Sequence, residues 1–303
     1  MLEYRWNHRT PWNHSHSVGF AKVTMTAAAT PKQVIVTGAF DDLRSLQIRF
    51  LEEAARLGEL TALLWADDLV RQFEGKPPKF PQAERAYFLQ GIRFVRRVQV
   101  VARQFDGNAL PEVAGLRPEV WAVRESGNHP ARKSYCEARG LQCRVLPDSL
   151  LRGFPERPPD PPATAPGRKR VVVTGCYDWL HSGHVRFFEE VSAYGDLYVI
   201  VGHDANLRLL KGPGHPRFNQ EERRYLVGSI RYVTQAFISS GEGWLDADPE
   251  IRRLKPDIYA VNEDGDQGGK REYCAKLGIE YLVLRRAPAP GLPRRTSTNL
   301  RGF

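Results

Sequence analysis

Two stretches of this sequence repeat each other and decide the fold. Residues 34–75 read VIVTGAFDDLRSLQIRFLEEAARLGELTALLWADDLVRQFEG, and residues 171–212 read VVVTGCYDWLHSGHVRFFEEVSAYGDLYVIVGHDANLRLLKG. With one inserted residue the register continues, because FPQAERAYFLQGIRFV at 80–95 matches FNQEERRYLVGSIRYV at 218–233. RPEVWAV at 117–123 likewise matches KPDIYAV at 255–261. A register held over this length indicates an internal duplication.

Each copy alternates apolar runs with helical patterns. Runs such as VVVTG, LYVIVG, DIYAV and YLVL lack strict alternation, which favours parallel strands buried on both faces. We therefore expect an α/β protein with two tandem Rossmann-like domains, each a doubly wound parallel sheet. The predicted boundaries are 31–150 for the first domain and 170–303 for the second. The linker, 151–169, contains six prolines between Pro155 and Pro166, which disfavour helix and central strand.

The N-terminal residues and the composition limit the class of protein. Residues 1–30 lack the pattern of a secretory signal and are predicted to be a disordered tail, or leader sequence upstream of a start at Met25. The hydrophobic fraction of 42% is ordinary, and no apolar run is long enough to span a membrane. The four cysteines form no CxxC pair, which favours a reduced, cytoplasmic location.

The net charge of +9 is spread over scattered basic residues. No basic run is interleaved with aromatic residues, so the sequence does not indicate a nucleic-acid partner. An excess of cations fits a protein that handles anionic phosphates.

The residues that carry chemistry follow the first strand of the second copy, in GCYDWLHSGH at 175–184. Gly175 allows a tight turn near a ligand. His181 and His184 are three apart in the opening helical turn, so both imidazoles can face one side. Gly183 leaves room for phosphate oxygens at the helix N-terminus. The spacing predicts two imidazoles that hold a polyphosphate and stabilise its charge in the transition state.

Three further features could bind phosphate. Lys211 lies in RLLKG, and Arg223 lies in the first turns of a helix capped by Asn219, where a cation is unfavourable unless an anion binds nearby. PRRTSTNL at 293–300 sets hydroxyl groups beside two arginines. A solvated surface lysine and a disordered basic tail are the alternative interpretations.

These motifs resemble those of the cytidylyltransferase family, and within it the tandem phosphoethanolamine cytidylyltransferases. GCYDWLHSGH is similar to the signature G-x-F-D-x-x-H-x-G-H. KGPGHPRFNQEERRYLV is similar to a K-G-P-P segment followed by a Q-E-E-R helix, and RRTSTNL to a shortened R-T-x-G-x-S-T-T motif. The shortening leaves open which arginine acts.

The resemblance implies transfer of CMP from CTP to a small phosphorylated alcohol, such as phosphoethanolamine or glycerol phosphate. The acceptor oxygen would attack the α-phosphate in line and release pyrophosphate, with Mg²⁺ accompanying the nucleotide and no metal site of the protein's own. The expected catalytic residues are His181, His184, Lys211 and Arg294. The expected nucleotide-binding residues are Gly175, Cys176, Tyr177, Asp178, Gly183, Asp204, Arg223, Asn262, Asp264, Arg295, Thr296, Ser297 and Thr298.

The first copy departs from this pattern. Arg44 and Gln47 replace the two histidines, Leu46 replaces the glycine, Glu74 stands at the lysine position, and only Arg85 matches its counterpart Arg223. Leu46 would block a phosphate and Glu74 would repel it, so this half is predicted not to turn over. We expect it to pack on the active half as an internal pseudo-dimer, in a protein that is a monomer or homodimer.

Two other functions stay open. RLLKG and the STN ending are also similar to adenylyltransferases that activate heptose phosphates, so ATP and a sugar phosphate are an alternative pair of substrates. Base choice is expected to depend on Asn262, Glu263 and Asp264 after DIYAV. The protein could instead be a non-catalytic nucleotide sensor, against which the intact histidines and lysine argue.

Overall fold

The computed structural model describes residues 31–156, 160–162 and 164–300. The predictions for residues 1–30 lie outside the described residues. The described residues form one compact unit. Among the described residues, no helix has the length and apolar character needed to cross a membrane.

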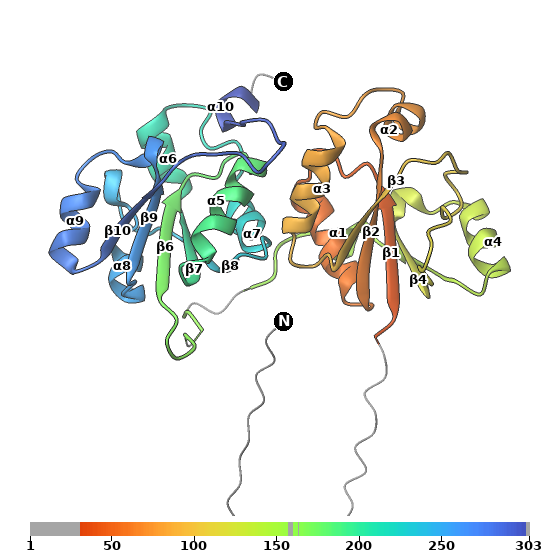
Figure 1. Ribbon diagram of the computed structural model, residues 1–303, viewed down its shortest axis with the longest axis horizontal. Helices are drawn as coiled ribbons and strands as arrows, with labels where there is room; N and C mark the ends of the chain where they lie inside the picture. The colour runs from red at the N-terminus through yellow and green to blue at the C-terminus, as the bar shows by residue number, and fades with distance from the viewer. Residues whose placement is uncertain (1–30, 157–159, 163, 301–303) are drawn as a thin grey trace, which may run out of the picture. The chain divides into compact units, whose positions relative to one another are not determined.

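The N-terminal half contains a five-stranded sheet in the order β3-β2-β1-β4-β5 (Figure 1). All its pairings are parallel. The strands are β1 (Gln33–Gly38), β2 (Glu59–Trp65), β3 (Arg97–Val101), β4 (Val120–Arg124) and β5 (Gln142–Leu146), and the helices are α1 (Ser45–Ala55), α2 (Asp67–Glu74), α3 (Gln82–Gly91) and α4 (Pro130–Ala138).

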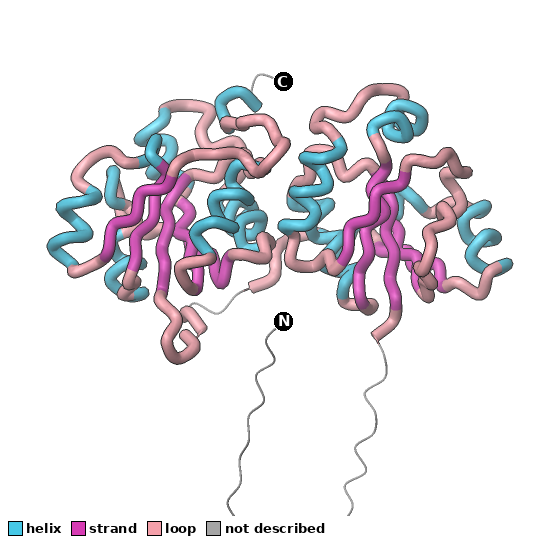
Figure 2. Tube along the Cα trace, in the orientation of Figure 1, coloured by secondary structure: helices cyan, strands magenta, loops and turns pink. Residues whose placement is uncertain are grey.

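The C-terminal half repeats this topology in a second parallel sheet, ordered β10-β9-β6-β7-β8 (Figure 1). Figure 2 shows the strands of both sheets in magenta with the helices around them in cyan. Read from the β8 edge, the order is that of the first sheet. The strands are β6 (Arg170–Gly175), β7 (Asp196–Val201), β8 (Val233–Ile238), β9 (Ile258–Asn262) and β10 (Glu280–Leu284). The helices are α5 (Ser182–Ser192), α6 (Asp204–Lys211), α7 (Gln220–Gly228), α8 (Asp248–Leu254), α9 (Lys270–Leu277) and α10 (Ser297–Leu300).

Both faces of each sheet are buried. In β1, Val34 and Val36 belong to one apolar cluster, whereas Ile35 between them belongs to another on the opposite face. In β6, Val171 and Val172 divide in the same way. Successive side chains of a strand point to opposite faces, so these continuous Val/Ile runs form because both faces are covered. The fold is α/β with two five-stranded parallel sheets, as the sequence pattern predicted.

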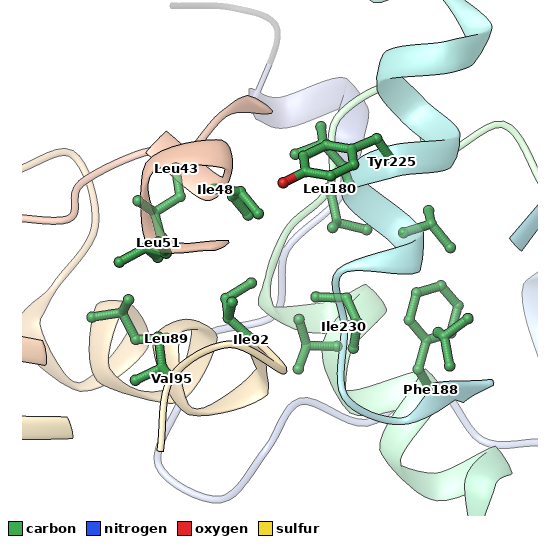
Figure 3. Packing of buried hydrophobic residues seen from close by; sticks show 14 of the residues in the cluster. Leu43, Ile48, Leu51, Leu89, Ile92, Val95, Leu180, Phe188, Tyr225 and Ile230 are labelled. Atoms are coloured by element: carbon green, nitrogen blue, oxygen red, sulfur yellow. The ribbon is translucent and has the colours of Figure 1, made fainter. Parts of the chain in front are cut away.

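The two halves share one of these apolar clusters (Figure 3). Ile48 and Leu51 of α1 and Ile92 after α3 lie in the same buried cluster as Phe188 of α5 and Ile230 after α7. All five are fully buried or nearly so. Burial of this kind stabilises both halves at once, since separating them would expose the shared cluster to water.

Several polar contacts between the halves occur in matched pairs. Ile92 and Ile230 form an antiparallel bridge. Beside it, the amide of Arg93 donates to the Ser229 carbonyl at 2.9 Å and the amide of Arg231 donates to the Gly91 carbonyl at 2.8 Å. Such exchange of equivalent contacts is the property of an isologous, two-fold interface.

Side chains follow the same two-fold rule. Ser182 Oγ donates to Glu84 Oε1 and Ser45 Oγ donates to Glu222 Oε1, both at 2.6 Å. The hydroxyl of Tyr87 reaches Glu189 at 2.7 Å, and that of the matching Tyr225 reaches Glu52 at 2.8 Å. The sequence repeat therefore corresponds to a repeat of contacts as well as of topology.

Candidate active site

A pocket of about 420 Å³ opens at the carboxyl ends of β6 and β9, the edge at which parallel sheets bind ligands. Its lining comes from residues 175–181, here called the signature loop, from α5, from the end of α6, from the loop after β9 and from the C-terminal segment. The lining residues are Thr174, Gly175, Cys176, Tyr177, Asp178, Gly183, His184, Phe187, Lys211, Ala260, Val261, Asn262, Asp264, Gly265, Lys270, Arg286, Thr296 and Ser297.

The signature loop owes its shape to Gly175, Tyr177 and Asp178. Tyr177 has a positive φ of 50° and is buried, and a Cβ on Gly175 would lie 2.8 Å from its Cζ. Only glycine therefore leaves room for the ring. Asp178 Oδ1 accepts the amides of Arg217 and Phe218 at 2.6 and 3.0 Å, so this carboxylate anchors the loop before α7.

The two histidines lie against each other at the start of α5. Their ring centroids are 3.9 Å apart with an interplanar angle of 29°. His181 caps the helix, because its Nδ1 accepts the Gly183 amide at 3.1 Å. A Cβ on Gly183 would come within 3.0 Å of His181 Cε1, so the glycine makes space for this ring as well as lining the pocket. His184 lines the pocket, whereas His181 lies behind it, 2% exposed.

Both imidazoles are held neutral. Burial, followed by the charges of His184 and Arg286, lowers the pKa of His181 far below its usual range. The pKa of His184 falls to about 3, because burial is reinforced by Arg286 and Lys211 and only partly opposed by Asp264. A neutral imidazole has one N–H to donate. His184, which lines the pocket, can therefore donate one hydrogen bond to a phosphate oxygen there.

Two of their nitrogens are buried without a hydrogen-bond partner in the described part of the chain: His181 Nε2 and His184 Nδ1. Since Nδ1 of His181 accepts a hydrogen bond, its neutral tautomer carries the proton on Nε2. A buried donor without a partner costs free energy, and a bound ligand is one way to recover it.

Cations surround His184. Lys211, at the end of α6, lines the same pocket, so the structure brings together the histidine and the lysine that the sequence singled out. Sequence reasoning missed Arg286 and Lys270. Arg286 bonds to the carboxylate of Asp264 and donates to the Arg295 carbonyl at 3.1 Å. Lys270 donates to the Gly265 carbonyl at 2.7 Å, and burial lowers its pKa.

Comparison with known proteins identifies the family to which these site residues belong. The model of the family described as "Cytidylyltransferase-like" matches residues 172–286. An FAD synthase of Ferroglobus placidus is 38% identical over 120 residues, which are 39% of this chain and 75% of that protein. An FAD synthase of Pyrococcus horikoshii is 43% identical over 122 residues, 38% of this chain and 78% of that protein. The chain belongs to the cytidylyltransferase-like family of nucleotidyltransferases.

A third relative has a longer chain. The "Bifunctional protein HldE" of Aliarcobacter butzleri is 34% identical over 120 residues, 39% of this chain and 24% of that protein. The family resemblance inferred from the motifs is thereby confirmed, while the names of the relatives differ from the phosphoethanolamine cytidylyltransferases that the sequence suggested.

Arg223 has a different place from the one expected in a cytidylyltransferase-like protein. Its side chain is 0% exposed, and it does not line the pocket. Its guanidinium donates to the carbonyls of Phe218, Cys176 and Gly202 and to Asp204 Oδ1, at 2.7 to 2.9 Å. The geometry therefore assigns Arg223 and Asp204 to the support of the signature loop, because their polar atoms are already engaged with each other and with the backbone.

The closing segment also differs in part from expectation. Thr296 and Ser297 line the pocket, but Arg294 and Arg295 do not. Arg294 is exposed, and both arginines border a small cavity that adjoins the pocket and shares Gly183, Asn262 and Arg286 with it. Arg295 is bound to a carboxylate of the N-terminal half. The side chain of Thr298 lies outside the described residues.

The N-terminal half keeps an equivalent pocket of about 360 Å³ with altered chemistry. Gln47, Glu74 and Arg124 line it at the positions of His184, Lys211 and Asn262. Leu46, which was expected to block phosphate, is 36% exposed and does not line it. Arg44 turns instead toward the other half, with its Cζ 3.9 Å from the centroid of the Trp179 ring.

Within the described residues, no group of three or more His, Cys, Asp or Glu side chains is arranged to hold a metal ion.

Proposed function

We propose that the C-terminal half transfers a nucleoside monophosphate from a nucleoside triphosphate to a phosphate oxygen of a small acceptor, with release of pyrophosphate. The observation that supports this most is the meeting of His184, Lys211 and the Thr296–Ser297 segment in one pocket. These groups come from elements far apart in the chain and offer neutral and cationic donors to a polyphosphate.

In this proposal, an acceptor phosphate oxygen attacks the α-phosphorus in line. One P–O bond forms and the bond to the bridging oxygen of the β-phosphate breaks, and the electron pair leaves with pyrophosphate. No proton has to be removed from an anionic phosphate, so the low pKa of His184 is no obstacle. His184 donates a hydrogen bond, and Lys211 neutralises charge on the leaving phosphates.

Mg²⁺ belongs to the nucleotide substrate in this scheme. It takes several of its ligands from phosphate oxygens and water in such sites, so a protein cage is not required.

The nucleotide has two candidates. The relatives named FAD synthase favour ATP, because FAD contains an adenine nucleotide. The signature, K-G-P and closing motifs favour CTP with a phosphorylated alcohol, and the same motifs suit ATP with a sugar phosphate. Asn262 and Asp264 line the pocket beside the last strands, where they could contact the base.

The N-terminal half is proposed not to turn over, since a carboxylate at Glu74 would repel a triphosphate in the pocket that it lines. Its contribution is structural, through the shared apolar cluster.

The test is pyrophosphate release by the full chain with each nucleoside triphosphate against a panel of FMN, phospho-alcohols and sugar phosphates. Release with ATP alone supports adenylyl transfer, and release with CTP alone supports cytidylyl transfer. If nucleotides bind tightly but no pyrophosphate is released with any combination of nucleotide and acceptor in the panel, transferase activity is contradicted and a nucleotide sensor is supported.

A further inference from the structure

The N-terminal half contributes a buried carboxylate that contacts two segments adjoining the C-terminal pocket. Glu84 lies on α3 and is 3% exposed. It accepts Ser182 Oγ at 2.6 Å and forms a two-pronged ion pair with Arg295, whose Nε and Nη2 lie 3.1 and 2.8 Å from Oε2. One side chain of the half that lacks the histidines thus holds two segments of the other.

Both partners of Glu84 adjoin groups that face the pocket. Ser182 stands between His181 and Gly183 at the start of α5. Arg295 immediately precedes Thr296 and Ser297, which line the pocket. Its carbonyl also accepts a hydrogen bond from Arg286, another lining residue, at 3.1 Å. Glu84 therefore connects the histidine-bearing helix with the closing segment.

Neighbouring apolar contacts hold the same closing segment. Phe80, of the N-terminal half, packs in one small cluster with Trp179 of the signature loop and Leu300 of α10. Arg295 Cζ lies 5.4 Å from the Phe80 ring centroid. N-terminal side chains thus contact the closing segment at Arg295 and at Leu300.

The chemistry of Glu84 makes this a strong restraint. A carboxylate buried to this degree needs both its partners, because an uncompensated buried charge is costly. Because the guanidinium of Arg295 is paired with Glu84, it is not available to bind a triphosphate. The backbone of the next two residues is then fixed relative to His184.

We infer that Glu84 is a positioning residue of the C-terminal nucleotidyltransfer site, acting through Ser182 and Arg295; this rests on the proposed function. The duplicated half thereby completes the site with a side chain of its own, in addition to covering an apolar face.

The chain supplies a matched control. Glu222 occupies the equivalent position on α7 and accepts Ser45 Oγ at the same 2.6 Å, beside the pocket that lacks the histidines. Glu84→Gln and Glu222→Gln remove equivalent carboxylates from the two ends of one pseudo-symmetric interface. Ser182→Ala removes only one of the two contacts of Glu84.

The experiment compares steady-state kinetics of these full-length variants, with amide hydrogen exchange measured on the same samples. Glu84→Gln is expected to lower kcat/KM by about 10- to 100-fold, as misplacement of reacting groups does, with Glu222→Gln within about twofold of the unchanged protein. Exchange at residues 182–185 and 293–297 should accelerate in Glu84→Gln alone. The reversed pair Glu84→Arg/Arg295→Glu should recover part of the lost kcat/KM and part of the lost protection from exchange.

The two proposals fail differently. If the unchanged protein releases no pyrophosphate with any substrate pair, the proposed function is contradicted. The exchange data still test the role of Glu84 in that case. Equal exchange and equal kinetics in the two glutamine variants would overturn the inference. A large loss in both, without recovery in the reversed pair, would overturn it too, since Glu84 would then only hold the halves together.

Discussion

Arg85 and Arg223 make equivalent hydrogen bonds in the two halves of the chain. Each donates to one main-chain carbonyl before its helix, to carbonyls at the carboxyl ends of the first two strands of its half and to one aspartate, Asp67 or Asp204. The two arginines are 2% and 0% exposed. A half that has lost its histidines keeps this arrangement, so the arginine serves the fold in both.

Arg223→Met and Arg85→Met are therefore expected to destabilise the protein to similar degrees, by about 1–3 kcal/mol, because each leaves main-chain carbonyls and a partly exposed aspartate without their buried partner. Urea denaturation measures this. A stable Arg223→Met protein that had lost triphosphate affinity would return Arg223 to the nucleotide site. Arg85→Met serves as the comparison, since it leaves the C-terminal pocket untouched.

His184→Ala should lower turnover by about 100- to 1,000-fold, the usual cost of removing one donor to a developing phosphate charge. Little loss of stability is expected, since the ring lines a pocket instead of filling a core. Rapid-quench or coupled pyrophosphate assays give the rate, with Gln47→Ala as the control at the equivalent position. Near-normal turnover in His184→Ala would exclude this imidazole from the reaction.

Acid should destabilise the protein through its two stacked histidines. Their pKa values are depressed in the folded state, that of His184 to about 3, whereas an unfolded histidine titrates near 6.5. Below about pH 6.5 the unfolded chain binds more protons, so stability is full above that pH and falls by about 1.4 kcal/mol per pH unit for each histidine. The loss should level off only near the folded-state pKa.

Denaturation of the unchanged protein and of His181→Asn/His184→Asn at pH 7.5 and 5.5 measures this difference. The double variant should lose less stability on acidification. An equal loss of stability in the two proteins would show that the rings accept protons freely in the folded protein.

Lys211→Glu should weaken triphosphate binding by about 10- to 100-fold, since it places a carboxylate where Glu74 stands in the other half. Isothermal titration with a non-hydrolysable nucleotide reports the change. Glu74→Lys provides the reverse substitution and should leave C-terminal affinity unaltered. Equal affinity in Lys211→Glu would mean that the lysine does not contact phosphate.

The sheets and the main pocket could be predicted because they depend on local patterns. Val34 to Val36 and Val171 to Val173 show the continuous apolar character of strands buried on both faces. The edge at which those strands end then places the pocket. His184 and Lys211 both line that pocket, whereas His181, which the motif placed beside them, does not.

The remaining site residues could not be predicted from local patterns. Arg223 was expected to bind an anion because it opposes a helix dipole, but its partners are carbonyls from distant loops that only the folded chain brings together. Arg286 and Lys270 lie in no recognised motif. The signal that would have indicated Arg286 is its position shortly after β10, since all strands of a parallel sheet end at one edge.

The matched contacts of Ile92 and Ile230, and of Ser45 and Ser182, have an evolutionary consequence. In a homodimer one gene segment encodes both sides of an interface, so every mutation appears twice. Fusion of two copies removes that coupling, and each side can then change alone. If the N-terminal half does not turn over, as proposed, one copy exchanged its phosphate-binding groups while the surface that faces the other copy was kept, and the expected stoichiometry is a single nucleotide per polypeptide.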